Sequence, residues 1–179
     1  QAQMATEVTV AVRNKVRKAF NDIMTSVKAK MPEAKIQGIF IEHMVSFKHE
    51  CILGCNKDPL FGPVILFGMG GVTVELFKDT NLACPPIDMH EAKRLIDGTK
   101  ISKLLYGFRG MEGCDVEGLK QFIVQFSQLV MDFPEIEQID INPLALSTKE
   151  FFVLDSKIVL DKKLIGKQVP KYSHLVFKP

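Results

Sequence analysis

The chain has 179 residues, 46% of them hydrophobic, and its 23 basic and 21 acidic side chains leave a formal net charge of +2. This length suits one well-buried domain, and the near-neutral charge gives no whole-molecule argument for nucleic-acid or membrane binding. Because no apolar run reaches the ~20 residues of a membrane span and no signal-like segment opens the chain, we expect a soluble, cytoplasmic protein.

The first part of the chain predicts a strand, a helix and two further strands. Valines alternate over residues 6–12, which is typical of a strand, and a helix follows from Asn14 to the proline after Met31. Residues 36–44 and 50–55 predict two strands joined by a polar turn. Cys51 and Cys55 share one face of the second strand; we interpret them as buried thiols, with a metal site as the weaker alternative.

A glycine-rich turn over residues 68–71 separates two apolar segments, 64–67 and 72–76, that predict strands. No helix follows these glycines, so they do not form a phosphate-binding loop at a helix N-terminus. They indicate a sharp turn or the close approach of another group. Glu75, in the second segment, is either a solvated strand residue or a functional acid, and its spacing does not decide between the two.

Two further helices are predicted from capping patterns. Asp88 and Glu91 form a capping box that opens the first of them. A short apolar helical piece over residues 101–106 then leads to Arg109, which two glycines flank; its guanidinium either faces a phosphate or carboxylate or extends into water. Asp115 caps the helix with the clearest 3.6-residue apolar stripe of the chain.

The next segment predicts a strand with one buried and one polar face. Ile139 and Ile141 alternate with Asp140 and Asn142, so the two oxygen-bearing side chains share a face. Together with the preceding elements this predicts an α+β fold, an antiparallel sheet with helices packed on one side.

A hairpin continues this strand, because residues 147–150 have the composition of a turn. This register pairs Leu146 with Phe151 and Asn142 with Asp155. An amide oxygen facing a carboxylate suits a hard cation such as Mg²⁺, which takes its other ligands from water and phosphate. The alternative is an edge hairpin in solvent, and a one-residue slip would move Asp155 to the other face. Residues 157–179 predict a final strand and, from residue 161, a C-terminal arm.

Four blocks carry a family resemblance: residues 58–63 (DPLFGP), 67–79 (FGMGGVTVELFKD), 105–110 (LYGFRG) and 133–144 (FPEIEQIDINPL). In this order they resemble the ATP-grasp domain of NDP-forming acyl-CoA synthetases, and most closely the ADP-forming acetyl-CoA synthetases (acetate–CoA ligases). The resemblance runs from about residue 8 to residue 160. It implies an ATP-grasp C-terminal lobe of an acid–thiol ligase that converts acyl-CoA, ADP and phosphate to carboxylate, CoA and ATP through an acyl phosphate and a phosphohistidine.

The resemblance also implies the cofactors ATP or ADP and Mg²⁺, and roles for individual residues. Asn142 and Asp155 would hold Mg²⁺ on the nucleotide phosphates, and Asp140 would orient the incoming phosphohistidine. Arg109 would contact phosphate, and Glu75 would serve the metal or the glycine loop.

A further implied site is the crossing between the two ATP-grasp lobes, where the chain passes the adenine. Glu42, His43, Met44 and Val45 occupy this position. Backbone groups there would hydrogen-bond the base, so the identity of the side chains says little.

One part of the family pattern has no counterpart here: the phosphate-gripping lysine and the His-Lys motif ahead of a Gly-Gly-Val strand. We therefore expect residues 1–179 to be a single, partial ATP-grasp domain that lacks the N-terminal lobe and is inactive alone. The implied partners are that lobe and a CoA-binding or ligase domain or subunit carrying the phosphorylated histidine, in an oligomer. Alternatives are a non-catalytic regulatory module of a protein lysine acetyltransferase and a succinyl-CoA synthetase-type beta subunit.

Overall fold

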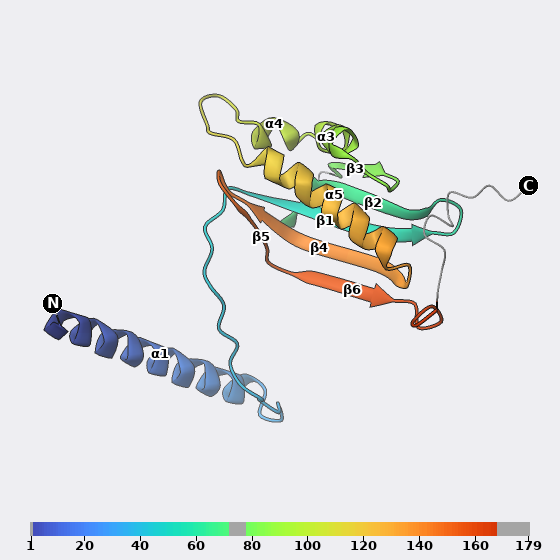
Figure 1. The fold of residues 1–179 in the computed structure, drawn as a ribbon. Helices are drawn as coiled ribbons and strands as arrows, with labels where there is room; N and C mark the ends of the chain where they lie inside the picture. Colours follow the sequence, from blue (N-terminus) through green and yellow to red (C-terminus); the bar gives the residue numbers. More distant parts are fainter. Residues whose placement is uncertain (1, 72–77, 168–179) are drawn as a thin grey trace, which may run out of the picture. The chain divides into compact units, whose positions relative to one another are not determined.

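The computed structural model describes residues 2–71 and 78–167, and the chain forms two compact units, Gln1–Met44 and Val45–Pro179 (Figure 1). Within the described ranges, no helix combines the length and apolar character that crossing a membrane requires.

The first unit contains one long helix, α1 (Ala2–Lys30). The strand predicted over residues 6–12 is therefore wrong, as is the helix start at Asn14, whereas the helix does end before Pro32. An isolated strand leaves its backbone groups unpaired, while a helix pairs them within the segment; no described segment pairs with these residues as a strand. Several apolar side chains of α1 are exposed, among them Val12 (55%) and Phe20 (48%).

Residues 34–47 form neither helix nor strand. The predicted strand over residues 36–44 is wrong for the same physical reason, because no described strand pairs with it. Its apolar side chains are open to solvent, with Phe40 86% and Met44 91% exposed.

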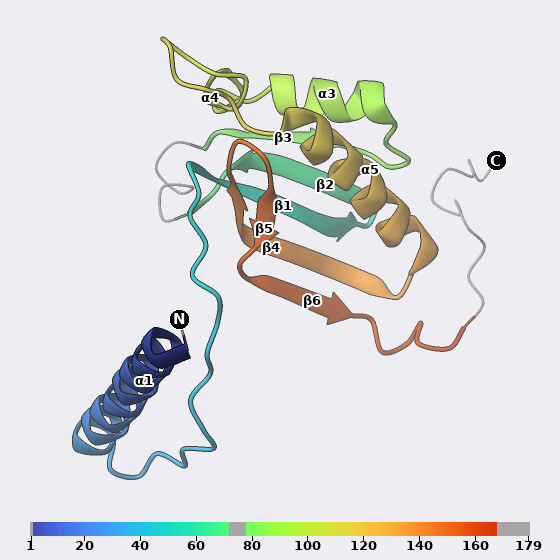
Figure 2. The same cartoon turned by 60° about the vertical axis from the view of Figure 1, so that its left-hand side comes forward.

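The second unit is built on a six-stranded, fully antiparallel sheet in the order β3-β2-β1-β4-β5, with β6 also paired to β4. Figures 1 and 2 show its helices gathered over one face of this sheet. The strands are β1 (His49–Asp58), β2 (Gly62–Met69), β3 (Thr80–Ala83), β4 (Ile136–Leu146), β5 (Phe151–Val153) and β6 (Ser156–Leu160). The predicted fold class is confirmed.

The helices of this unit are α3 (Met89–Asp97), α4 (Ser102–Leu105) and α5 (Val116–Asp132). As the capping patterns predicted, Asp88 accepts from the Glu91 N–H at 2.8 Å and Asp115 from the Gly118 N–H at 2.9 Å. Each cap satisfies a backbone donor that the first turn leaves unpaired.

The core lies between these helices and the sheet. Apolar side chains from alternate positions of β1, β2 and β4 meet the buried stripes of α3 and α5. Cys51 (0% exposed) and Cys55 (5%) lie in this core, which confirms that they are buried. Burial raises the pKa of both thiols, that of Cys55 to about 11; both are therefore protonated, poor ligands for a metal.

The hairpin register is confirmed. Leu146 lies opposite Phe151 and Leu144 opposite Val153, and the Asn142 N–H donates to the Asp155 carbonyl oxygen at 3.2 Å. The second predicted strand, residues 151–155, is divided between β5 and β6 at Leu154 and Asp155.

Strand β3, which is only four residues long, was not predicted from the sequence. It begins after Asp79, a buried carboxylate (6% exposed) that accepts from the N–H groups of Lys100 at 2.6 Å and Ile101 at 2.8 Å. Asp79 thereby ties the edge of the sheet to the start of α4.

Candidate functional site

The polar candidate site residues of β4 lie on the open face of the sheet, which is the face that α3 and α5 leave uncovered. Ile139 (3% exposed) and Ile141 (6%) point into the core, whereas Asp140 and Asn142 are half-buried on the other side of the strand. The predicted alternation of buried and polar positions is confirmed.

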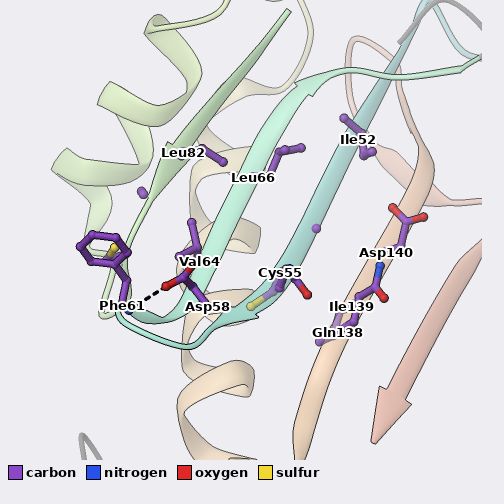
Figure 3. Close-up of a pocket in the computed structure, with 14 residues that line it drawn as sticks. Ile52, Cys55, Asp58, Phe61, Val64, Leu66, Leu82, Gln138, Ile139 and Asp140 are labelled. Atoms are coloured by element: carbon purple, nitrogen blue, oxygen red, sulfur yellow. Dashed lines mark hydrogen bonds between the residues drawn. The ribbon is translucent and has the colours of Figure 1, made fainter. Parts of the chain in front are cut away.

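An open hollow of about 690 Å³ lies on this face. Figure 3 shows it spanning β3, β2, β1 and β4, with Asp140 at one side and Phe61 at the other. Its walls are mainly apolar, with Ile52, Leu66 and Leu82 among them. A shallow, mainly apolar surface whose lining includes the two acids Asp58 and Asp140 can hold a flat or extended ligand and orient a polar group of it.

The β1–β2 turn shapes one end of the hollow. The Asp58 carboxylate accepts from the N–H groups of Phe61 at 3.0 Å and Leu60 at 2.8 Å, as an Asx turn does. These bonds, led by that from Phe61, lower the pKa of Asp58. They hold the turn that presents Phe61 to the hollow.

Asp140 lies in the middle of the sheet, between two cross-strand neighbours. Gly54 of β1 is opposite it on one side and Lys157 of β6 on the other. Glycine contributes no side chain, so Asp140 borders open space on the hollow side.

Asn142 is bound to the glycine turn. Its Oδ1 accepts from the Gly71 N–H at 3.0 Å, and the Gly70 N–H donates to the Glu50 carbonyl oxygen at 2.9 Å. Gly71 has φ +72°, a left-handed backbone conformation that favours glycine, and a Cβ there would displace the end of the Glu50 side chain. Asn142 and Glu50 thus meet the turn from two strands.

The residues at this point fit a hard divalent cation. Asn142 supplies an amide oxygen with a second lone pair, and Asp155, whose backbone lies opposite, supplies an exposed carboxylate. Among the described residues no group of three His, Cys, Asp or Glu side chains gathers around a common point. Mg²⁺ tolerates such an incomplete protein shell, since water and nucleotide phosphates complete it.

Arg109 lies in the loop between α4 and α5. It has φ +48°, and its guanidinium carbon is 5.2 Å from the centroid of the Phe108 ring. Lys48, just before β1, holds the same loop by donating to the Glu112 carbonyl oxygen at 3.1 Å. Arg109 is exposed, and the described contacts do not join it to Asp140, Asn142 or Asp155.

The remaining candidates lie at a boundary or outside the described residues. Glu42, His43 and Met44 are exposed at the end of the first unit, and Val45 opens the second. Glu75 falls in residues 72–77, outside the described residues. The roles of these residues stay predictions.

Three residues near the site were not predicted from the sequence: Gly54 and Lys157, which flank Asp140, and Glu50, which contacts the glycine turn. The contact between Gly71 and Asn142 joins residues 71 positions apart, and no local pattern indicates it. Gly54 did carry a signal, because a glycine inside a central strand often marks the close approach of a ligand or a backbone.

Comparison with known proteins identifies the family of this chain. Residues 4–160 match the model of a family described as an ATP-grasp domain. The chain is 36% identical over 151 residues to "Acetate–CoA ligase [ADP-forming] I" of Archaeoglobus fulgidus, covering 84% of this chain and 22% of that protein. It is 35% identical over 160 residues to the beta subunit of "Acetate–CoA ligase [ADP-forming] I" of Pyrococcus furiosus, covering 88% of this chain and 66% of that one.

Solved structures of the dinucleotide-forming acetyl-coenzyme A synthetase 1 of Ca. Korarchaeum cryptofilum are similar at 38% sequence identity. One, in complex with coenzyme A, Ca-AMPCP and HgCl⁺, has a TM-score of 0.72 and covers 83% of this chain and 65% of that chain. Another, with coenzyme A and Mg-AMPPCP and a phosphohistidine segment pointing towards the nucleotide binding site, has a TM-score of 0.63 and covers 65% and 55%.

An antiparallel sheet with helices on one face is the architecture that the present chain shares with these relatives. The chain belongs to the ATP-grasp family, in the part that includes the ADP-forming acyl-CoA ligases. The resemblance indicated by the four sequence blocks is confirmed. The chain spans 22% and 66% of the two curated relatives.

Proposed function

We propose that this chain is the nucleotide-binding part of an ADP-forming acyl-CoA synthetase, which forms ATP from acyl-CoA, ADP and phosphate. The observation that carries the proposal is the backbone pairing of Asn142 with Asp155. Asn142 lies on β4, the strand that also bears Asp140. Two oxygen-bearing residues near Asp140, which lines the hollow, suit the transfer of a phosphoryl group to a nucleotide, since such chemistry depends on positioning and charge neutralisation.

Each residue has a separate task in this proposal. Asn142 and Asp155 hold the phosphate-bound cation, and Mg²⁺, when bound, neutralises phosphate charge. The Gly71 bond fixes the Asn142 amide, so that its free lone pair keeps one direction. Arg109 contacts phosphate, and backbone groups of residues 42–45 bind the base.

Asp140 acts on the phosphoryl donor, a histidine of the ligase part phosphorylated by an acyl phosphate. It accepts a hydrogen bond from the ring N–H of the phosphohistidine and so orients the ring. The P–N bond breaks with its electron pair staying on the ring nitrogen, while a β-phosphate oxygen of ADP forms the new P–O bond. The Korarchaeum relative with its phosphohistidine segment turned towards the nucleotide site supports this direction of approach.

The test uses the full-length parent protein with acetyl-CoA, ADP, phosphate and Mg²⁺. We expect Asn142→Ala and Asp155→Ala each to lower ATP formation on the order of a hundredfold or more, with unchanged thermal unfolding. Asp161→Ala is the matched control, because the Asp161 carboxylate accepts from the Lys163 N–H beyond β6 in an exposed turn. Its activity should equal that of the wild type.

A second readout separates metal binding from turnover. Mn²⁺ bound with ADP is followed by electron paramagnetic resonance, and both alanine variants should weaken it. Asn142→Asp retains an oxygen for the Gly71 N–H and for the metal, so it should bind Mn²⁺-ADP. Wild-type turnover and Mn²⁺ binding in both alanine variants would contradict the metal assignment.

A further inference from the structure

Gly54 interrupts a row of side chains that crosses the open face. Cross-strand pairing places Leu82, Leu66, Gly54, Asp140 and Lys157 side by side on β3, β2, β1, β4 and β6. Leu82, Leu66, Gly54 and Asp140 all line the hollow. Along this row, two apolar side chains are followed by the gap at Gly54, then by an acidic and a basic side chain. Figure 3 shows Leu66 and Asp140 on either side of β1.

The backbone of Gly54 does not require glycine, since its φ lies outside the left-handed region. A glycine in a central strand weakens that strand. A Cβ at this position would lie 3.2 Å from the Ile139 carbonyl oxygen and 4.0 Å from Asp140 Oδ1. A side chain here would therefore crowd β4 slightly and would fill the space beside the acid.

The empty position forms a slot of ring dimensions. Adjacent strands are about 4.8 Å apart, so the backbones of Leu66 and Asp140 are separated by roughly 9–10 Å across Gly54. That width admits a flat ring with van der Waals contact of about 3.5–4.0 Å on each side. One wall is the Leu66 side chain and the other is the Asp140 carboxylate, which suits a ring with an apolar face and an N–H donor.

We propose that Gly54 helps to position the phosphoryl donor, because its missing side chain leaves a slot between Leu66 and Asp140 that receives the imidazole of the phosphohistidine. This rests on the proposed function and adds the site where the donor ring lies. Leu66 contacts the ring and Asp140 accepts its N–H, which points the phosphorylated nitrogen at ADP. In the transfer, the P–N bond of the phosphohistidine breaks and its electron pair stays on the ring nitrogen. A β-phosphate oxygen of ADP forms the new P–O bond.

The experiment measures one half-reaction in the full-length parent protein. The protein is phosphorylated on its histidine with acyl phosphate, Mg-ADP is added, and the rate of ATP formation is followed in a single turnover. Mg-ADP affinity is measured separately by calorimetry, and thermal unfolding checks each variant. The variants are Gly54→Ala, Gly54→Val and the double variant Gly54→Val with Leu66→Ala; Gly38→Ala is the matched glycine control, since a Cβ there meets nothing within 4 Å.

We expect Gly54→Val to slow the transfer on the order of a hundredfold, while Mg-ADP affinity stays unchanged. Removing the opposite wall in the double variant should restore about tenfold of this loss, because the ring can shift towards position 66. Gly54→Ala should show a smaller loss and carries the test if Gly54→Val does not fold. Gly38→Ala should match the wild type.

Three results would overturn the proposal. Wild-type transfer rates in both Gly54 variants would show that the slot is not used. If the Gly54 variants lost Mg-ADP affinity as well as transfer rate, position 54 would belong to the nucleotide site. If the transfer rate fell and did not recover in the double variant, the effect of Gly54 would be one of strand packing. A wild-type parent that neither binds Mg-ADP nor forms ATP would instead refute the proposed function, and this inference with it.

Discussion

Asp79 is a buried residue whose role is structural. Its carboxylate is 6% exposed and accepts two backbone hydrogen bonds, from Lys100 and Ile101, across a gap of about twenty residues. Ile101 is itself buried. Because the bond from the Ile101 N–H is buried and that from the Lys100 N–H is partly buried, water cannot fully replace the carboxylate as their partner.

Replacing Asp79 should therefore destabilise the fold. We expect Asp79→Ala to lower the free energy of unfolding by about 3 kcal/mol, since it leaves buried donors unpaired, and Asp79→Asn by about half of that. Urea denaturation measures both. Asp58→Ala is the control: it also removes a two-bond acceptor, but in an exposed turn where water replaces it. Equal losses at the two positions would contradict the role of burial.

At the scale of residues, the sequence predicted the pairing of Asn142 with Asp155 because it depends on two local features, the period of β4 and the length of its turn. It did not predict that Asn142 binds the Gly71 N–H or that Gly54 borders Asp140. Those contacts follow from how β1 and β4 align. No local pattern in a single sequence predicts how these two strands align.

At the scale of elements, the correctly predicted helices are those with local signals. The caps Asp88 and Asp115 and the apolar stripe of α5 define them without reference to the rest of the chain. The errors concern the strands predicted over residues 6–12 and 36–44 and the start of the first helix, which the first of these strands displaced to Asn14. A strand is stable only beside a partner, and the alternation of apolar residues says nothing about whether the partner exists.

Helices α3 and α4 are joined by a bond that pH should test. The Tyr106 hydroxyl donates to Asp97 Oδ1 at 2.8 Å. Tyr106 is 49% exposed; its partial desolvation, and then the bond and charge of Asp97, raise the pKa of Tyr106 to about 12, against an ordinary value near 10. Because the raised pKa favours the protonated hydroxyl in the fold, this contribution to stability is present below about pH 10 and is lost as pH rises through about 12.

The prediction is that Asp97→Asn lowers the pKa of Tyr106 but leaves it above its ordinary value, since burial remains. Tyrosinate absorbance during an alkaline titration measures it, in a Tyr172→Phe background that leaves Tyr106 as the single tyrosine. Tyr106→Phe provides the blank. A Tyr106 pKa unchanged by Asp97→Asn would contradict the assigned bond.

At the scale of the whole molecule, the two faces of the sheet separate the core from the candidate site. The face under α3 and α5 carries the core, and the open face carries the hollow, Asp140 and Asn142. This division explains why the fold class was predictable: a single buried face produces the alternation that sequence analysis detects. The hollow was not predictable, because its apolar walls, Ile52 and Leu66, have the same composition as core positions.

The second unit should fold without the first. Every buried hydrophobic residue of the described chain lies between Cys51 and Leu146, and none of them belongs to α1. A truncated chain beginning at Val45 should therefore keep one cooperative thermal transition, within about 5 °C of that of the whole chain. A shorter chain beginning at Gly54 is the control: it removes Cys51 and Leu53 from the core and half of β1, so it should not fold. Loss of the cooperative transition in the chain beginning at Val45 would show that the first unit stabilises the sheet.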